Sequence, residues 1–129
     1  MFDGCTNLRI DELYLPNLKI INGGFEGCDV HKITNLGSIT KVAGFSNNAN
    51  LTSVVLPETV TTIEYKAFSN CTGLTTINIP ESVTTINGMA FSNCTSLVID
   101  ELYLPNLKTF SSNFAFHNIS RISRIISLG

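Results

Sequence analysis

The sequence contains little charge, no tryptophan and no long apolar run. Its eight basic residues nearly balance its ten acidic residues, and the formal net charge is -2. This balance offers no positive surface for a nucleic-acid backbone or an anionic membrane. No apolar segment reaches the roughly 20 residues of a membrane-spanning helix, and the opening residues lack the basic and apolar regions of a signal peptide. We therefore expect no nucleic-acid binding and no membrane insertion.

The chain is also poor in the residues that favour exposed helices. Threonine, serine and asparagine occupy most polar positions at the expense of lysine and glutamate, and this balance favours β-structure. The chain has 129 residues, of which 43% are hydrophobic and 14% are charged, as expected for one folded domain. We predict a single β-rich domain over residues 1–129 with little helix.

Aromatic residues mark an internal repeat. A phenylalanine is followed three residues later by cysteine, or once by asparagine, and successive copies lie 23, 20, 23 and 23 residues apart. The copies are Phe2-x-x-Cys5, Phe25-x-x-Cys28, Phe45-x-x-Asn48, Phe68-x-x-Cys71 and Phe91-x-x-Cys94. A repeat of this length is typical of a solenoid, in which each copy forms one turn.

Each repeat also contains a strand signature. Apolar residues occupy the first, fourth and sixth places of a unit that ends in proline, and the alternation at the last two places indicates a short strand. The copies are Ile10-x-x-Leu13-x-Leu15-Pro16, Leu51-x-x-Val54-x-Leu56-Pro57, Leu74-x-x-Ile77-x-Ile79-Pro80 and Ile99-x-x-Leu102-x-Leu104-Pro105. Proline cannot donate a ladder hydrogen bond, so it should end the strand. A further unit, seen in Val60-x-x-Ile63 and Val83-x-x-Ile86, should turn more apolar side chains inward.

A longer repeat spans four of these turns. Leu8–Phe25 aligns with Leu97–Phe114 at an offset of 89 residues, and Ile10–Lys19 is identical to Ile99–Lys108. The same offset places Ile119–Ile122 on Val30–Ile33 and His117 in the slot of Cys28. We predict about five turns and the start of a sixth strand. Neither end carries a polar capping segment, so we expect an uncapped domain that belongs to a longer array or self-associates end to end.

The segment Leu56–Pro80 and its continuation through Ala90–Leu97 closely resemble the BspA-like (Treponema pallidum-type) leucine-rich repeat. This resemblance implies a right-handed leucine-rich repeat solenoid with one parallel sheet on its concave face. It also implies a surface or secreted protein, mostly of host-associated bacteria, with a role in adhesion. The turn from Phe25 to Phe45 departs from the pattern, because it is short and has Asn35 where an apolar residue belongs. The family shares an architecture rather than a ligand, so only a class of function follows.

The polar places of the strand unit should line one continuous face of the solenoid. On this face an acidic and aromatic row recurs every fourth turn, followed each time by a basic row. The candidate ligand-binding residues are Asp11, Glu12, Tyr14, His31, Lys32, Asp100, Glu101, Tyr103 and Arg121. Tyrosine offers flat amphipathic area with little loss of rotamer freedom, and an adjacent carboxylate can receive a basic or sugar-like group.

The same charges have a second interpretation, which is compatible with the first. Neighbouring strands of a parallel sheet lie roughly 4.8 Å apart, so Glu12 would face Lys32 and Glu101 would face Arg121. Exposed pairs of this kind stabilise a sheet by at most about 1 kcal/mol each.

The four cysteines form no recognisable metal or disulfide pattern. The sequence has no C-x-x-C pair, and a slot that also accepts Asn48 is typical of a core or turn position. Thiols stacked along one line do not converge on a tetrahedral metal site, and parallel side chains fit the dihedral angle of a disulfide poorly. We expect free, buried thiols, no metal site and no cofactor.

The acidic residues do not indicate catalysis. Pairs that recur 89 residues apart would lie about four strands, roughly 19 Å, from each other, whereas paired glycosidase carboxylates lie under about 10 Å apart. No nucleophile elbow, phosphate loop or oxyanion motif accompanies them. We therefore expect a non-catalytic binding module of an extracellular or cell-surface protein, which recognises a protein or a glycan through its concave sheet face. The alternative is a structural spacer or a self-assembling repeat segment without a ligand of its own.

Overall fold

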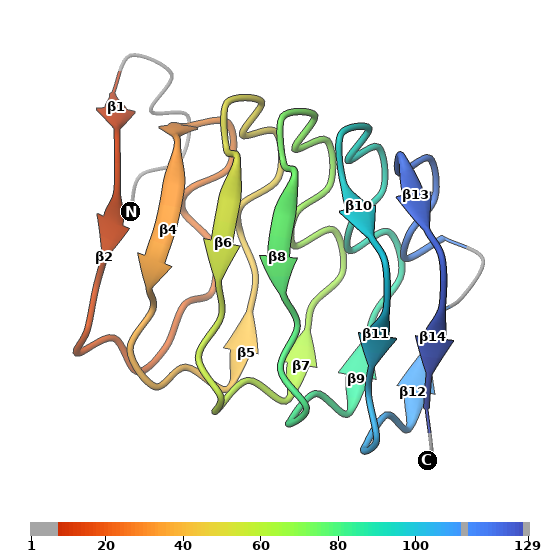
Figure 1. The fold of residues 1–129 in the computed structure, drawn as a ribbon. Coiled ribbons are helices and arrows are strands. Elements are labelled where there is room, and N and C mark those ends of the chain that lie inside the picture. The colour runs from red at the N-terminus through yellow and green to blue at the C-terminus, as the bar shows by residue number, and fades with distance from the viewer. Residues whose placement is uncertain (1–7, 112–113, 128–129) are drawn as a thin grey trace.

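The computed structural model describes residues 8–111 and 114–127. Over these residues the chain winds as a right-handed solenoid of short parallel strands and contains no helix (Figure 1). Five turns stack along one axis, and the front strands of a sixth turn follow them. We number the turns from the N-terminus, and turns 1 to 5 end at Phe25, Phe45, Phe68, Phe91 and Phe116. The predicted solenoid of about five turns is confirmed.

The front sheet takes one strand from each of turns 1 to 4. Its strands are β2 (Leu13–Tyr14), β4 (Lys32–Asn35), β6 (Ser53–Val55) and β8 (Thr76–Asn78), and they pair in this order. The apolar fourth place of the strand unit is buried at Leu13, Ile33 and Val54. The residues on either side of it point outward, as the two-residue period of a strand requires.

A second sheet lies behind the first (Figure 1), in addition to the one parallel sheet that the family resemblance implied. Its strands are β5 (Lys41–Val42), β7 (Thr62–Ile63), β9 (Thr85–Ile86) and β12 (Thr109–Phe110), in the spatial order β12-β9-β7-β5. Strands β7 and β9 end the units Val60-x-x-Ile63 and Val83-x-x-Ile86. Strands β5 and β12 end the similar segments Ile39-x-x-Val42 and Leu107-x-x-Phe110. Threonine hydroxyls reinforce this sheet, because Thr61 and Thr84 each donate to a carbonyl of the preceding turn at 3.2 Å. The core therefore lies between two sheets.

Three further strand pairs extend the ladders. They are β1 (Arg9–Ile10) with β3 (Asp29–Val30), β10 (Val98–Ile99) with β13 (Arg121–Ile122), and β11 (Leu102–Tyr103) with β14 (Ile125–Ile126). The last two pairs join turn 5 to the sixth turn. Over the described residues β11 pairs only with β14, so the front ladder that begins at β2 ends at β8.

The repeated phenylalanines form a continuous stack along the solenoid axis. The ring centroids are separated by 5.3 Å from Phe25 to Phe45, 5.7 Å to Phe68, 5.5 Å to Phe91 and 5.2 Å to Phe116. The rings are nearly parallel, with interplanar angles between 2° and 15°. Stacked aromatic rings at this separation stabilise a core beyond their buried area alone.

The slot three residues after Phe45, Phe68 and Phe91 holds a buried hydrogen-bond donor. The Sγ atoms of Cys71 and Cys94 donate to the carbonyl of the phenylalanine one turn earlier, at 3.1 and 3.0 Å. Asn48 Nδ2 makes the equivalent bond to the Phe25 carbonyl at 2.8 Å. Cys71 and Cys94 are free thiols, and burial raises the pKa of each to about 12. This confirms the expectation for these two cysteines; Cys28 is buried in the same slot, and Cys5 lies outside the described residues.

An asparagine ladder follows the same edge of the solenoid. Its members, Asn47, Asn70, Asn93 and Asn118, all have left-handed backbones with φ between 60° and 63°. The side-chain amides of Asn70, Asn93 and Asn118 each donate to the side-chain oxygen of the asparagine one turn earlier, at 2.9 to 3.1 Å. Asparagine tolerates this conformation better than most residues, so the ladder explains its recurrence.

Turn 2 accommodates its irregular sequence with a bulge. The register of β2 and β4 shifts between Leu13 and Tyr14, and Leu36 is fully buried one residue after the predicted apolar place at Asn35. The Asn35 Oδ1 atom instead accepts a bond from the Gly37 amide at 2.8 Å. Gly37 has a φ of 67°, and a Cβ atom there would lie 2.3 Å from the Leu18 carbonyl oxygen. The turn therefore requires glycine.

The predicted alignment of the sixth strand is wrong. Ile122 pairs with Ile99 and Ile125 pairs with Leu102, three residues later than the 89-residue offset places them. The aromatic stack accounts for two of these three positions, because it takes Phe116 in place of Phe114, which is 56% exposed. The slot predicted for His117 therefore falls on Ile119, which packs against the core.

Candidate functional site

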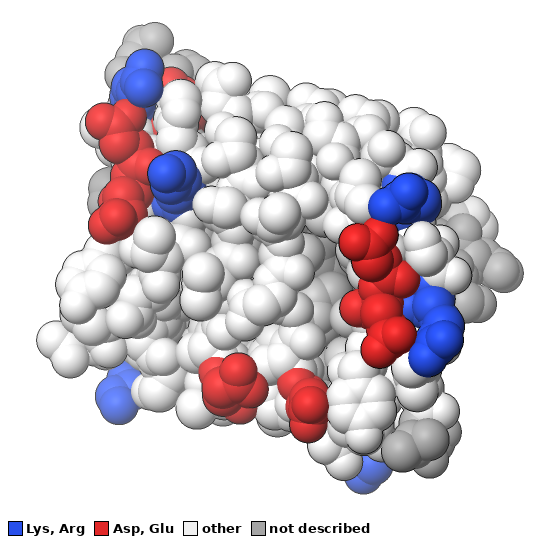
Figure 2. Space-filling model, viewed as in Figure 1, with Lys and Arg blue, Asp and Glu red and all other residues white. Residues whose placement is uncertain are grey.

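The front face is the surface formed by the outward side chains of the front sheet and of β10, β11, β13 and β14. Figure 2 shows two groups of mixed acidic and basic side chains at opposite ends of this face, with mostly neutral side chains between them. The N-terminal group contains Asp11, Glu12, Tyr14, His31 and Lys32, and the C-terminal group contains Asp100, Glu101, Tyr103 and Arg121. The structure thus brings the predicted residues together within each group but does not join the two groups.

In the N-terminal group, the acidic residues do not pair as predicted. Arg9 Nε donates to Asp11 Oδ1 at 2.6 Å, and this bond lowers the pKa of Asp11. The pairing of Leu13 with Ile33 sets Glu12 beside Lys32 as predicted, but among the described residues neither side chain has an ion-pair partner, so the predicted ion pair does not form. Both side chains are exposed, where the entropy of fixing two flexible chains offsets a weak attraction. Glu12 and Lys32 therefore remain available to a ligand.

His31 lies beside the acidic side chain of Asp29. Its Nε2 atom is 2.9 Å from Asp29 Oδ1 but makes no hydrogen bond to it. The same oxygen accepts a bond from Asn50 Nδ2 at 2.9 Å, which is the largest cause of the lowered pKa of Asp29. The His31 side chain is only 26% exposed, so it contributes less area to the front face than its neighbours do.

In the C-terminal group, two arginines engage the acidic pair. Arg121 Nη2 lies 2.6 Å from Asp100 Oδ1, and Arg124 Nη2 lies 3.3 Å from Glu101 Oε2. The predicted Glu101–Arg121 pair is wrong because Ile99 pairs with Ile122, and this register places Arg124 opposite Glu101. Both pairs are more than half exposed, and such pairs contribute little to stability.

The two tyrosines are the large aromatic side chains of these groups. Tyr14 is 60% exposed and Tyr103 is 40% exposed. Asn35, the register partner of Tyr14, and Asn78, on β8, show that smaller polar residues also fit the outward positions of these strands. Packing within the solenoid therefore does not explain the choice of tyrosine.

The charged groups form no arrangement that would support metal binding. Over residues 8–111 and 114–127, no cluster of three or more histidine, cysteine, aspartate or glutamate side chains could hold a metal ion. The same residues include no helix that is long and apolar enough to cross a membrane. The front face presents exposed aromatic side chains beside charged ones.

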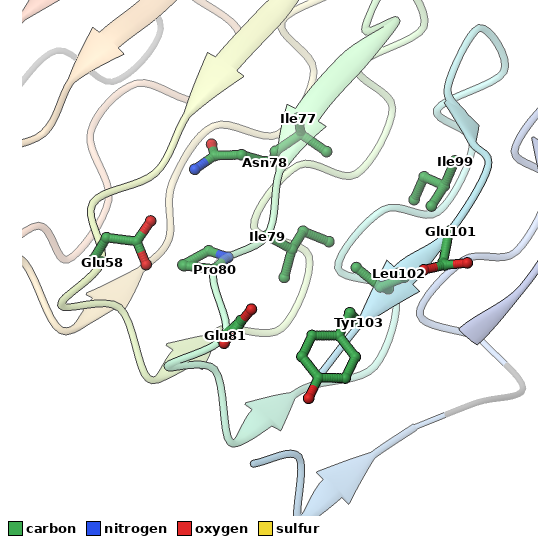
Figure 3. A pocket seen from close by; sticks show the side chains of 10 residues that line it. All are labelled: Glu58, Ile77, Asn78, Ile79, Pro80, Glu81, Ile99, Glu101, Leu102 and Tyr103. Atoms are coloured by element: carbon green, nitrogen blue, oxygen red, sulfur yellow. The ribbon is translucent and has the colours of Figure 1, made fainter. Parts of the chain in front are cut away.

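A cleft of about 450 Å³ opens the front face between β8 and β11 (Figure 3). Its walls are formed by Ile77, Ile79 and Pro80 on one side and by Ile99, Leu102 and Tyr103 on the other. In the described residues no backbone hydrogen bond crosses from the Leu74–Pro80 segment to the Leu97–Pro105 segment. Turns 4 and 5 are joined at the two ends of the cleft by hydrogen bonds from the side chains of Ser96 and Asn106.

The absence of a ladder leaves part of the core accessible from the cleft. Ile77 and Ile79 are only partly buried, whereas Val54 and Leu56, at the equivalent places of turn 3, are 2% and 1% exposed. On the side away from the cleft, Asn78 is bonded to turn 3. Its side-chain amide accepts from the Leu56 N–H at 2.6 Å and donates to the Leu56 carbonyl at 3.0 Å. Strand β8 is therefore held to β6 and open toward β11.

Chain length explains the cleft. Leu97 and Leu104 are seven positions apart, whereas the equivalent Leu74 and Ile79 are five positions apart. The two additional residues move β11 out of register with β8, while on the back β12 still pairs with β9. The cleft and its acidic rim residues Glu58 and Glu81 were not among the predicted site residues, although this change in spacing is a signal for the cleft.

The chain is similar in sequence and structure to known repeat proteins. A family model described as the BspA type leucine rich repeat region matches residues 42–128 in six copies. The crystal structure of a T. pallidum leucine rich repeat protein (TpLRR) matches with 25% sequence identity and a TM-score of 0.70. The match covers 78% of this chain and 51% of that one, so the chain spans about half the length of that protein. No curated protein matches the chain.

Proposed function

Because the chain belongs to the BspA type leucine rich repeat family, we propose that it is a non-catalytic module of an extracellular or cell-surface protein that binds a protein or a glycan through its front face. Leucine-rich repeat folds are typically non-enzymatic interaction scaffolds, and BspA type proteins are commonly secreted or found at the cell surface. We expect the front face to be the concave side of the solenoid.

The observation that carries this proposal is the pair of exposed tyrosines. Tyr14 and Tyr103 stand in identical Asp-Glu-Leu-Tyr segments on the same face, and both rings are substantially exposed. Binding energy at interfaces is usually concentrated in a few aromatic or arginine anchors. Two such anchors beside charged rows support a ligand-binding role for the front face.

An array of matrix proteins and glycans would identify a ligand, and a double variant would test the face. Tyr14→Ala with Tyr103→Ala should weaken binding by about 2 kcal/mol or more, with little change in thermal stability because both rings are exposed. Titration calorimetry would measure the affinity, and circular dichroism the stability. Unchanged affinity in the double variant would remove the front face from consideration.

Tyr65 provides a matched control. It is also 60% exposed, but it lies between β7 and Phe68, outside the front face, where its hydroxyl contacts the Met89 sulfur at 3.6 Å. Tyr65→Ala should leave ligand affinity unchanged. In a second control, Glu12→Ala with Glu101→Ala should alter mainly the salt dependence of binding.

The neutral middle of the front face favours a second candidate function. The outward positions of β6 and β8 carry small or neutral side chains, as expected of a structural spacer or a self-assembling segment. A chain that binds nothing on the array but forms concentration-dependent oligomers in analytical ultracentrifugation would support this alternative.

A further inference from the structure

The cleft between β8 and β11 presents an apolar floor beside an open strand edge. The half-buried side chains of Ile77 and Ile79 supply the floor. Strand β8 pairs with β6 on one side, and no described strand pairs with its other edge. Unpaired N–H and C=O groups along such an edge can accept an extended peptide as an additional strand.

Two carboxylates at the rim of the cleft are electrostatically uncompensated. The side chains of Glu58 and Glu81 lie on either side of Pro80 (Figure 3). Among the described residues neither carboxylate takes part in an ion pair. Glu101 differs, because its carboxylate is engaged by Arg124 and points away from the other two (Figure 3). The rim therefore has negative charge without a partner.

We infer that the cleft receives a lysine or arginine side chain carried on an extended segment of a protein partner, an inference that rests on the proposed binding function of the front face. The aliphatic stem covers Ile77 and Ile79, as long basic side chains commonly do on apolar surface. The cationic group then lies between Glu58 and Glu81, and the peptide backbone follows the open edge of β8. The cleft volume of about 450 Å³ lies within the range of small-ligand pockets.

The cleft is preformed because side chains hold its two ends. Ser96 Oγ donates to the Thr72 carbonyl at 2.7 Å, and Asn106 Nδ2 donates to the Glu81 carbonyl at 3.0 Å. On the back of the solenoid, β9 and β12 remain paired. A partner therefore meets a fixed opening and loses little binding energy to reorganisation of the protein.

A basic peptide fits these features better than a glycan does. A sugar could stack on Tyr103, but it would leave the charges of Glu58 and Glu81 uncompensated and the edge of β8 unpaired. A lysine-bearing extended peptide satisfies the charge, the apolar floor and the strand edge together. Glycan binding in the cleft is accordingly the competing outcome of the test.

The probe is the acetylated and amidated heptapeptide Ser-Thr-Val-Lys-Val-Thr-Ser, and its comparison peptide has uncharged norleucine in place of lysine. Amide resonances of isotopically labelled protein are followed by NMR during titration at low ionic strength, where screening is weak. We expect shifts confined to residues 56–59, 76–81 and 99–104 and at least tenfold tighter binding of the lysine peptide. Equal affinity for the two peptides, or shifts elsewhere, would contradict the inference.

Charge-removing variants locate the effect. Glu58→Gln with Glu81→Gln should reduce the affinity for the lysine peptide to that for the norleucine peptide, while Glu12→Gln, on an exposed carboxylate outside the cleft, should change it less than twofold. An unaffected double variant overturns the inference. The inference also fails if a panel of neutral oligosaccharides shifts the same resonances more strongly than the lysine peptide does.

The matched tyrosines distinguish failure of this inference from failure of the proposed function. Tyr103 lines the cleft and Tyr14 does not. Tyr103→Ala should weaken the affinity for the lysine peptide several-fold, and Tyr14→Ala should leave that affinity unchanged. If both variants fail to bind the ligand identified on the array but both keep the wild-type affinity for the lysine peptide, the front face binds a partner without using the cleft for a basic side chain.

Discussion

Ile10–Lys19 and Ile99–Lys108 have identical sequences but different surroundings. Each forms a strand at the same Leu-Tyr pair, and Leu13 and Leu102 are buried almost equally, at 6% and 5% exposure. Later in each segment the two copies differ, because Leu104 is 1% exposed whereas Leu15 is only partly buried. Turn 4 flanks the second copy, and no described turn lies on the N-terminal side of the first. Local sequence thus determines the strand, and the adjacent turn determines burial.

The ion pairs of the two copies show the same dependence on context. Asp11 is engaged by Arg9 of its own turn, but Val98 occupies the equivalent place in the second copy. Asp100 is engaged instead by Arg121, which the next turn supplies. The same aspartate of the repeat can therefore take its arginine partner either from its own turn or from the next turn.

The largest expected difference between the copies is in how much Leu104 and Leu15 each contribute to the free energy of unfolding. Leu104→Ala removes a side chain packed against turn 4 and should lower the free energy of unfolding by about 2–5 kcal/mol. Leu15→Ala, at the same place in an identical sequence, should cost only about 1 kcal/mol because the side chain is already partly exposed. Urea denaturation followed by circular dichroism would compare them. Equal losses would show that the adjacent turn does not control burial.

A smaller difference is expected where the copies diverge after their identical segments. Phe116→Ala breaks the aromatic stack at Phe91 and should destabilise the domain by about 2–3 kcal/mol, somewhat less than full burial would cost. Phe114→Ala should change stability by less than about 0.5 kcal/mol, because the ring is largely exposed. Thermal melts of the two variants would decide the alignment. A larger loss in the Phe114 variant would restore the simple 89-residue offset.

The smallest expected difference concerns the acidic rows. Glu101→Gln removes the exposed pair with Arg124 and should lower stability by at most about 1 kcal/mol, with the effect disappearing at high salt. Glu12→Gln should have no measurable effect, because Glu12 has no ion-pair partner among the described residues. Denaturation at low and high ionic strength would separate the two variants. A salt-sensitive loss in the Glu12 variant would indicate that it does pair with Lys32 in solution.

The period of the repeat was sufficient to predict the solenoid, the front strands and the phenylalanine core. These features depend on local alternation and on one aromatic residue per turn, such as Phe45 or Phe68, that recurs at nearly constant spacing. The cysteine slot was also predictable as buried. The hydrogen bond made from this slot was not predictable, because the accepting carbonyl beside Asn48 and Cys71 belongs to the preceding turn.

The features that escaped prediction depend on register between turns. The stack takes Phe116, whereas the 89-residue offset predicted Phe114 in that place, and the positions of Arg121 and Arg124 shift with it. The cleft arises because a front segment of seven positions follows one of five, and its consequence for hydrogen bonding between β8 and β11 is three-dimensional. Its rim residues Glu58 and Glu81 repeat with the 23-residue period, each directly after the proline that follows a front strand, but this repeat does not indicate that a cleft opens beside them.

The one-sided connection between turns 4 and 5 also has a mechanical consequence. The back of this junction is joined by the β9–β12 ladder and the Phe91–Phe116 stack, whereas its front is held by the Ser96 and Asn106 side chains. These side-chain bonds hold the opening at a fixed width while the solenoid is unstrained. Under tension along the solenoid, we expect the front cleft to widen before the back sheet separates, because two side-chain hydrogen bonds resist less than a strand ladder and an aromatic stack.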